Sequence, residues 1–257
     1  MMRSGKTVAI VQARMNSTRL PGKVMKPLAG APLIIRMLER VKRIKGIDEI
    51  AAAVPDSDDS APLIEALSGL DWLTIIKGPE ADVLARTSIA ARETGADTIV
   101  RITSDCPLVD PAVSESVLAA FRALGGVYAR TSIERGFPLG FDTEVLAADI
   151  LFEAEKEATD PYEREHVTPY IWRRPEKYPS LILGGIPDRR NWRLVVDTPE
   201  DYEMVKTVYD RLYASQPEFG FPELCALFSE YPEILKINAD VPSPVYVGLA
   251  SDDTSCP

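Results

Sequence analysis

The chain has 257 residues, 46% of them hydrophobic, and a net charge of −10 at pH 7. That length and composition suffice to bury a full core in one large or two small domains, which excludes disorder over most of the chain. The excess of acidic residues excludes a general nucleic-acid-binding protein, because such proteins present a basic face to the phosphates.

The first half of the chain alternates strand patterns with helix patterns. Short apolar, β-branched runs predict strands at 8–11, 48–55, 72–78 and 97–105. Apolar residues at helical spacing predict helices at 31–44, 59–70, 80–95 and 110–124. Asp110 followed by Pro111 is typical of a helix cap and its first residue. This alternation predicts an α/β fold, with a mostly parallel sheet and helices on both faces.

The second half of the chain is less regular. Strand patterns occur at 127–132, 143–146, 180–185 and 192–197. Helix patterns occur at 147–158, 163–174, 199–214 and 222–232, the second of them bent or broken by Pro169. No linker divides the chain, so we expect a single domain over residues 1–241. The last residues, 242–257, lack a pattern and are predicted to form a flexible C-terminal tail.

The loop after the first strand is basic although the chain is acidic. The segment VQARMNSTRLPGKVMK, residues 11–26, carries Arg14, Arg19, Lys23 and Lys26. Ligands of open α/β sheets bind beyond the carboxyl ends of the strands, and cations with Gly22 suit phosphate oxygens there. The segment is neither a G-x-G-x-x-G nor a Walker A motif. A solvated basic loop without a ligand is the alternative.

The cysteines and the absence of long apolar runs bear on the cell compartment. The cysteines, at 106, 225 and 256, are few, far apart and form no C-x-x-C pair. This argues against a disulfide framework or a zinc site and fits a reducing compartment. The N-terminal apolar run is too short for a signal peptide, and no segment has membrane-spanning length. We therefore expect a cytoplasmic protein that binds neither nucleic acid nor a membrane.

Several motifs together resemble one enzyme family. They are VQARMNSTRLPGKVMKPLAGAPLI, VLAR, ADTIVRITSDCPLVDP, GFPLGFDTEVL, EREHVTPYI and RLVVDTPEDYEMV, spread over residues 7–240. The chain thus resembles the cytidylyltransferases that make CMP-activated sugars. The similarity is greatest to the group of spore-coat polysaccharide biosynthesis protein F, which is related to CMP-KDO and CMP-sialic acid synthetases. The resemblance implies a Rossmann-like nucleotidyltransferase fold, CTP as donor, Mg²⁺ as cofactor and pyrophosphate as leaving group.

The resemblance implies a donor site with catalytic residues Arg14, Lys23, Asp105 and Asp197. Arg14, Arg19 and Lys23 would bind the triphosphate, and fixed cations there stabilise the charge of departing pyrophosphate. Asp105 and Asp197 each follow a predicted strand and would bind the metal, since Mg²⁺ prefers carboxylate oxygens. The alternative for each is helix capping. The base would be read around two further residues, Ala13 and Thr103.

The neighbouring helices have other caps, which favours the metal role over capping. Asp110 is the better cap for the helix after Asp105. Thr198 and Asp201 form a capping box for the helix after Asp197.

The acceptor side rests on three residues: His166, Asp142 and Glu144. His166 is the one histidine of the chain and falls in the acceptor-facing motif of the family. Asp142 and Glu144 alternate, so in a strand they would point to one face. The motif GFPLGFDTEVL departs from the FPDGLDVEVF of relatives, since Leu139 replaces an acid and Phe141 a leucine. That departure leaves the identity of the acceptor open.

The leading hypothesis is a cytidylyltransferase that transfers CMP from CTP to a small, acidic sugar or related acceptor for surface polysaccharide. A glycosyltransferase of similar fold is one alternative, disfavoured because TSDCP lacks a D-x-D motif. A non-catalytic nucleotide-binding protein is another, disfavoured because Arg14, Lys23, Asp105 and Asp197 are all present. The oligomeric state is open, with a homodimer through residues 135–175 as one option.

Overall fold

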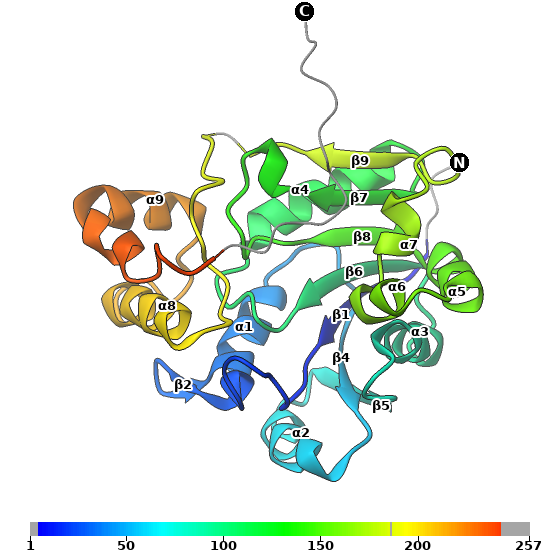
Figure 1. The fold of residues 1–257 in the computed structure, drawn as a ribbon, viewed down its shortest axis with the longest axis horizontal. Coiled ribbons are helices and arrows are strands. Elements are labelled where there is room, and N and C mark those ends of the chain that lie inside the picture. The colour runs from blue at the N-terminus through cyan, green and yellow to red at the C-terminus, as the bar shows by residue number, and fades with distance from the viewer. Residues whose placement is uncertain (1–4, 186, 243–257) are drawn as a thin grey trace, which may run out of the picture.

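A seven-stranded sheet forms the centre of the molecule, and the computed structural model describes residues 5–185 and 187–242 (Figure 1). The strands are β1 (Thr7–Gln12), β4 (Glu49–Pro55), β5 (Leu73–Gly78), β6 (Thr98–Thr103), β7 (Tyr128–Thr131), β8 (Glu144–Ala147) and β9 (Ser180–Leu183). Their order is β5-β4-β1-β6-β8-β7-β9. Only β8 runs antiparallel to its neighbours in this sheet. This arrangement confirms the predicted α/β fold with a mostly parallel sheet.

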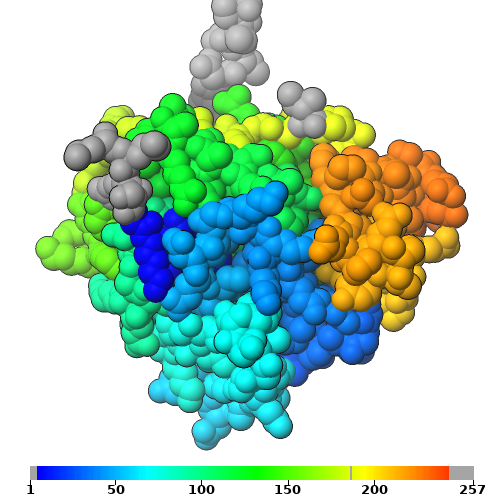
Figure 2. All heavy atoms as spheres, turned by 180° about the vertical axis from the view of Figure 1, so that it is seen from behind, coloured from blue at the N-terminus to red at the C-terminus, as the bar shows by residue number. Residues whose placement is uncertain are grey.

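Helices cover both faces of the sheet and bury alternate side chains of each strand. On one face pack α1 (Leu33–Val41), α2 (Ala61–Ser68) and α4 (Pro111–Ala123). Figure 2 shows this face from behind, with α1 and α2 in blue and cyan. On the other face pack α3 (Val83–Glu93), α5 (Ala148–Glu157) and α7 (Pro169–Trp172). Neighbouring residues Val8 and Ala9 of β1 belong to opposite cores, as the period of a strand requires.

The C-terminal helices form a third apolar cluster beside the sheet. Helices α8 (Pro199–Leu212) and α9 (Phe221–Glu230) lie on the left in Figure 1. Their apolar side chains pack against Leu20 and Leu28 of the segment after β1 and Leu108 of the segment after β6. The short 3-10 helices are η1 (Lys23–Met25), η2 (Asp58–Ser60), η3 (Ile133–Arg135) and η4 (Pro232–Lys236), and β2 (Pro27–Leu28) pairs with β3 (Ala31–Pro32). The C-terminal helices therefore brace the loops at the carboxyl edge of the sheet.

Two sequence predictions concern the C-terminal tail and membrane-spanning segments. Of the predicted tail 242–257, residues 243–257 lie outside the described residues. Among the helices of residues 5–185 and 187–242, none is both long and apolar enough to cross a membrane.

The strand predicted at 192–197 is wrong, and so is the placement of Asp197 at a strand end. The segment joins no sheet: it makes one isolated bridge, between Arg193 and Leu139. The backbone N–H of Leu194 donates to the carbonyl of Leu139 at 2.7 Å, and that of Val196 donates to the carbonyl of Asp105 at 2.8 Å. The extended segment thus satisfies its backbone on two loops at the carboxyl edge of the sheet instead of on a strand.

A glycine makes that contact between segments possible. Gly140 has φ +104°, and a Cβ at this position would lie 2.6 Å from the backbone carbon of Leu194. A side chain there would collide with the backbone and also force a left-handed conformation. The apolar pattern of 192–197 looks like a strand because Leu194 and Val196 are buried, but they pack against α8 and α9.

The predicted helix caps are confirmed. Asp110 Oδ1 accepts from the N–H of Val113 at 2.9 Å, with Pro111 at the first position of α4. Thr198 and Asp201 form the capping box of α8. Neither Asp105 nor Asp197 is used as a cap, so both carboxylates are available for other partners.

A buried ion pair joins the 192–197 segment to α8. The Arg193 guanidinium donates to both carboxylate oxygens of Asp201, from Nε at 2.7 Å and from Nη2 at 2.8 Å. Asn238 also donates to Asp201 at 2.9 Å. Burial alone would raise the pKa of Asp201, but these hydrogen bonds outweigh burial and lower it. Asp201 therefore stays ionised and fixes the segment that carries Asp197.

We expect Asp201→Ala to lower the free energy of unfolding by roughly 3–5 kcal/mol, because it leaves the Arg193 charge buried without its partner. The stabilisation by Asp201 exists above its unfolded pKa and is lost as pH falls through its lower folded pKa, so the deficit should shrink in acid. Urea denaturation between pH 3 and 7 measures both effects. The exposed Glu203→Ala change on the same helix is the control, and an equal effect of the two would contradict this account.

Candidate active site

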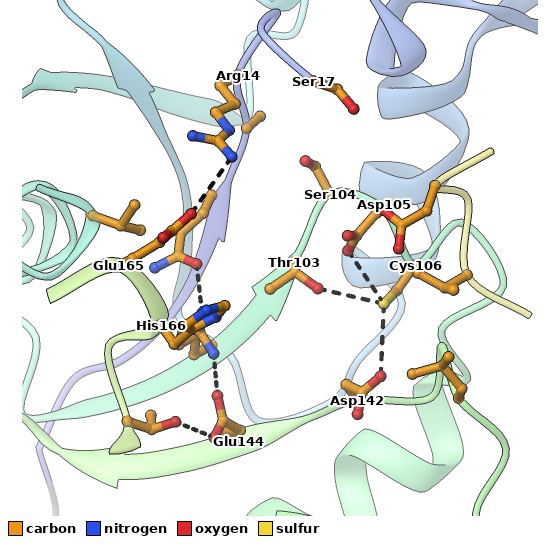
Figure 3. A pocket seen from close by; sticks show the side chains of 18 of the residues that line it. Arg14, Ser17, Thr103, Ser104, Asp105, Cys106, Asp142, Glu144, Glu165 and His166 are labelled. Atoms are coloured by element: carbon orange, nitrogen blue, oxygen red, sulfur yellow. Dashed lines mark hydrogen bonds and ion pairs between the residues drawn. The ribbon is translucent and has the colours of Figure 1, made fainter. Parts of the chain in front are cut away.

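A cavity of about 640 Å³ opens at the carboxyl ends of β1 and β6 (Figure 3). Its walls come from the loop after β1, the turn after β6, the start of β8, the segment around α6 (Pro161–His166) and the end of 192–197. All of the residues singled out from the sequence line it: Ala13, Arg14, Arg19, Lys23, Thr103, Asp105, Asp142, Glu144, His166 and Asp197. The volume is in the range of small-molecule sites.

The floor of the cavity lies where one face of the sheet changes from apolar to polar. On β6, Ile99 packs in the core, whereas Arg101 and Thr103 on the same face line the cavity. On β8, Leu146 packs in the same core and Glu144 lines the cavity. Side chains two residues apart share a face, so one strand both builds the core and supplies the site.

A lysine between two aspartates is the centre of the site. Lys23 Nζ lies 2.8 Å from Asp197 Oδ1 and 3.3 Å from Asp105 Oδ2, and it donates to the carbonyl of Val196 at 2.8 Å. Burial alone would lower the pKa of Lys23, but the charges of Asp105 and Asp197 outweigh it and raise the pKa. Burial alone would raise the pKa of Asp105, and Lys23 reverses that shift. Lys23 and Asp105 are therefore both charged.

Two further cations reach Asp197. Arg19 Nη2 lies 2.8 Å from Asp197 Oδ2, and Arg193 Nη2 lies 3.5 Å from the same oxygen. The Arg19 side chain is 55% exposed, whereas that of Arg193 is buried. Asp197 thus contacts an exposed cation from the first loop and a buried one from its own segment.

The two aspartates fit a hard divalent cation. Their carboxylates converge on one positive group, Lys23, although they come from segments far apart in sequence. No group of three or more His, Cys, Asp or Glu side chains suited to a metal occurs in the part of the chain that the structure describes. A cation at Asp105 and Asp197 would need phosphate and water oxygens as well, which is the usual environment of Mg²⁺ beside a nucleotide.

Glu144 lines the cavity, but its carboxylate already has several partners. Arg101 donates to Oε2, and both Tyr128 and Thr168 donate to Oε1, the latter at 2.6 Å. Burial alone would raise the pKa of Glu144, but Arg101 and these hydrogen bonds lower it. Arg101 also donates to Gln12 at 2.8 Å. Glu144 therefore ties the floor to α7, and its predicted contact with an acceptor stays a prediction.

Asp142 has a different environment from that of Glu144. Its carboxylate accepts from the N–H of Gly140 at 3.0 Å and lies 4.0 Å from Cys106 Sγ (Figure 3). Burial raises the pKa of Asp142 to about 6, and the charges of Asp105 and Glu144 add to that rise. The group consequently changes protonation near neutral pH.

His166 reaches the cavity through a strained turn. The predicted helix 163–174 is broken into α6 and α7, and between them Val167 has φ 74° and ψ −62°. The N–H of Thr168 donates to the carbonyl of His166 at 2.9 Å, which closes a γ-turn of the strained type. Burial lowers the pKa of His166, so its imidazole is neutral at pH 7. Such strain is typical of functional sites.

Arg14 lines the cavity on the side of Glu165. Its Nη2 is 3.9 Å from Glu165 Oε1, next to His166 (Figure 3). The pair is about half exposed and therefore weak. Arg14 stands between the first loop and α6, within reach of ligands on either side.

The sequence reasoning missed several residues of the cavity. Arg86, Arg101 and Arg130 all line it. Nε of Arg86 and of Arg130 is buried without a hydrogen-bond partner among the described residues. Arg130 could have been found from the alternation of side chains along a strand. It lies two residues after Tyr128, a core residue, and therefore on the same face of β7. The half-buried Arg189 and the exposed Arg190, which precede the 192–197 segment, do not line the cavity.

Comparison with known proteins gives consistent matches over most of the chain. A family model described as cytidylyltransferase matches residues 8–223. Spore coat polysaccharide biosynthesis protein SpsF of Bacillus subtilis (strain 168) is 33% identical over 232 residues, 87% of this chain and 94% of that protein.

Solved structures agree on the fold. A cytidylyltransferase from Leptospira borgpetersenii serovar Hardjo-bovis superposes with a TM-score of 0.85 at 29% identity, covering 94% of this chain and 99% of that one. CMP:2-keto-3-deoxy-manno-octonic acid synthetase complexed with CTP has a TM-score of 0.61 at 18% identity, covering 80% of this chain and 99% of that one. The second likeness confirms the Rossmann-like nucleotidyltransferase fold.

We expect Asp142→Asn to stabilise the protein at pH 8. Because burial raises the pKa of Asp142 to about 6, the folded protein holds this proton more tightly than the unfolded chain does. Ionising the buried carboxyl at higher pH therefore lowers the free energy of unfolding. The variant keeps the hydrogen bond from Gly140 and should gain about 1–2 kcal/mol at pH 8 and nothing at pH 4. Urea denaturation across this range, with the exposed Asp56→Asn as control, measures the gain. A loss of stability at pH 8 would show that the charge of Asp142 is needed by the fold.

Proposed function

The chain belongs to the cytidylyltransferase family and is a CTP-dependent nucleotidyltransferase, and we propose that it transfers CMP to a small acidic sugar or related acceptor for surface polysaccharide. The observation that carries the proposed site is the convergence of Asp105 and Asp197 on one cation beside the basic first loop. The name of the Bacillus subtilis relative supports the polysaccharide role.

The first loop is the proposed donor site. Arg14 and Arg19 have side chains about half exposed to the cavity, and Lys23 stands at its base. Cations at these places would bind the triphosphate and stabilise the charge of departing pyrophosphate. The base would be read near Ala13 and Thr103, which line the cavity at the ends of β1 and β6.

The proposed reaction is a single in-line displacement. An oxygen of the acceptor attacks the α-phosphorus of CTP, the bond from that phosphorus to the bridging oxygen breaks, and pyrophosphate leaves with the electron pair. His166 is neutral and faces the cavity, so it would accept the proton of an acceptor hydroxyl. No covalent enzyme intermediate is needed, since Cys106 is held as a thiol by burial, which raises its pKa.

Asp105 and Asp197 would hold a divalent cation, for which we propose Mg²⁺. The cation would neutralise charge on the phosphate oxygens and orient the α-phosphate. The carboxylates themselves need a fixed geometry, and Arg193 supplies it for Asp197 through the buried pair with Asp201.

The acceptor end of the cavity contains His166, Asp142 and Arg130. Arg130 lies beside Glu144 in the register of β7 and β8, and Glu144 is already paired with Arg101. An arginine in this position suits an acidic acceptor, because guanidinium binds carboxylate or phosphate through two parallel hydrogen bonds. We propose further that the protein acts in the cytoplasm; a homodimer through residues 135–175 stays a prediction.

The direct experiment is a pyrophosphate-release assay with CTP, Mg²⁺ and a panel of sugar acids, neutral sugars and phosphorylated small molecules. The proposal expects release that requires CTP, the metal and an acidic acceptor together. Release that is equally fast with neutral sugars would overturn the acceptor class. Transfer of a sugar from a nucleotide sugar without pyrophosphate release would favour the glycosyltransferase alternative.

We expect Asp105→Asn and Asp197→Asn each to reduce turnover at least about a hundredfold at saturating Mg²⁺. Each change keeps the shape of the side chain but removes one charge from the cation site. Neither residue caps a helix, and either variant leaves Lys23 one carboxylate partner, so the melting temperature without ligands should change little. Asp210→Asn, a surface change on α8, is the matched control. Near-normal turnover in either folded variant would remove that residue from the metal site.

We expect His166→Gln to lower kcat with the acceptor at saturation and to leave CTP affinity unchanged. Glutamine retains hydrogen bonding but cannot take up the proton. The rise of wild-type kcat with pH through the lowered pKa of His166 should disappear in the variant. Steady-state kinetics between pH 5 and 8 and calorimetric titration with CTP measure the two effects. Weaker CTP binding with unchanged acceptor kinetics would place His166 on the donor side.

A further inference from the structure

Lys23 occupies the space that a divalent cation on Asp105 Oδ2 and Asp197 Oδ1 would need. Its ammonium group contacts Asp105 Oδ2, Asp197 Oδ1 and the carbonyl of Val196, all within 3.3 Å. The lysine side chain is only 12% exposed, so water does not replace these contacts. Three oxygens from two distant segments thus form a cage for one positive charge.

The cage cannot serve both cations at once. Mg²⁺ lies about 2.0–2.1 Å from its oxygen ligands, and an ammonium group hydrogen-bonded to the same carboxylates stands in that space. Two adjacent positive charges between the same oxygens would also repel each other in a partly buried site. A metal bound through these same oxygens therefore requires Lys23 to leave its present position.

Lys23 has a more flexible side chain than Arg193, the other little-exposed cation beside Asp197. Lys23 begins η1 after Gly22, whose φ of 67° makes a tight turn at the base of the first loop. Its side chain is a flexible four-carbon stem with a compact charge. Arg193 is different, since its guanidinium is fixed on Asp201 at 2.7 and 2.8 Å and stays beside Asp197. Among the cations on the two aspartates, Lys23 is the one that contacts both of them.

We propose that Lys23 competes with the divalent metal for Asp105 and Asp197, and that nucleotide binding relieves the competition by offering Lys23 phosphate oxygens instead. Lys23 then has two roles: it neutralises the carboxylates of the free protein and binds the triphosphate in the complex. The free protein consequently binds metal weakly, and nucleotide and metal strengthen each other's binding through this exchange. The proposal rests on the proposed donor site.

The exchange protects the site before the donor arrives. Without Lys23, Asp105 would lose its one ion-pair partner among the described residues and Asp197 would retain only Arg19 and Arg193, so the pair of carboxylates would attract divalent cations more strongly. With Lys23 in place, the metal enters with the phosphates that it must orient. The lysine thereby sets the order in which the site is assembled.

Titration with Mn²⁺ alone, followed by electron paramagnetic resonance of the free ion, tests the competition in the absence of turnover. The full chain and its Lys23→Met variant are compared. Lys26→Met is the matched control, because it removes the same charge three residues along the chain. The Lys26 ammonium lies over the ring of Tyr202 and does not contact the aspartates. We expect Lys23→Met to bind Mn²⁺ about tenfold or more tightly than wild type, and Lys26→Met to gain much less.

Two further variants keep the test decisive. Lys23→Gln serves in case Lys23→Met folds poorly, and Mn²⁺ should raise the melting temperature of either lysine variant more than that of wild type. The double change Lys23→Met with Asp105→Asn should lose the gain, which shows that the metal sits on the proposed oxygens.

A parallel titration with α,β-methylene-CTP separates this proposal from the proposed function. We expect the analogue to strengthen Mn²⁺ binding in wild type by a larger factor than in Lys23→Met. One outcome would overturn the competition and leave the proposed function standing: wild type, Lys23→Met and Lys23→Gln bind Mn²⁺ equally without nucleotide, and the analogue still strengthens the binding. No strengthening by the analogue in any protein would overturn both.

Discussion

The shared contact of Asp105 and Asp197 with Lys23 is the constraint on which the arrangement of the site depends. It joins the basic first loop, the turn after β6 and the 192–197 segment, which are far apart in the chain. Like charges on two neighbouring carboxylates would otherwise push these segments apart. The 192–197 segment is therefore held by further contacts: the backbone bonds of Leu194 and Val196 and the buried pair of Arg193 and Asp201.

The apolar clusters provide the stability that such a polar centre does not. Each face of the sheet packs against helices, and a third cluster under α8 and α9 supports the loops of the carboxyl edge. Buried ion pairs contribute little net stability, because desolvation offsets most of their attraction. Their value here is geometric, since Arg193 and Asp201 determine where Asp197 points. Glu144 acts in the same way for α7 and His166, through its contacts with Arg101 and Thr168.

Local patterns in the sequence predicted much of the fold, because helix caps and side-chain periodicity depend on residues close to one another in the chain. The starts of α4 and α8 were predicted correctly from Asp110 with Pro111 and from Thr198 with Asp201. Because these residues cap the helices, Asp105 and Asp197 are not used as caps. The segment 192–197 was misread because burial against helices gives the same apolar pattern as burial in a sheet. The pairings of Glu144 and the position of Lys23 between two aspartates depend on long-range contacts, which spacing along the chain does not encode. The resemblance to a family was needed to bring the site residues together.

The central claim is that this cavity recognises a cytidine triphosphate, and calorimetric titration of the full chain with CTP, UTP, ATP and GTP in the presence of Mg²⁺ tests it most directly. The base would lie at the ends of β1 and β6, near the small side chains of Ala13 and Thr103. The account predicts that CTP binds well ahead of both purine nucleotides. Equal or tighter binding of ATP or GTP would contradict it.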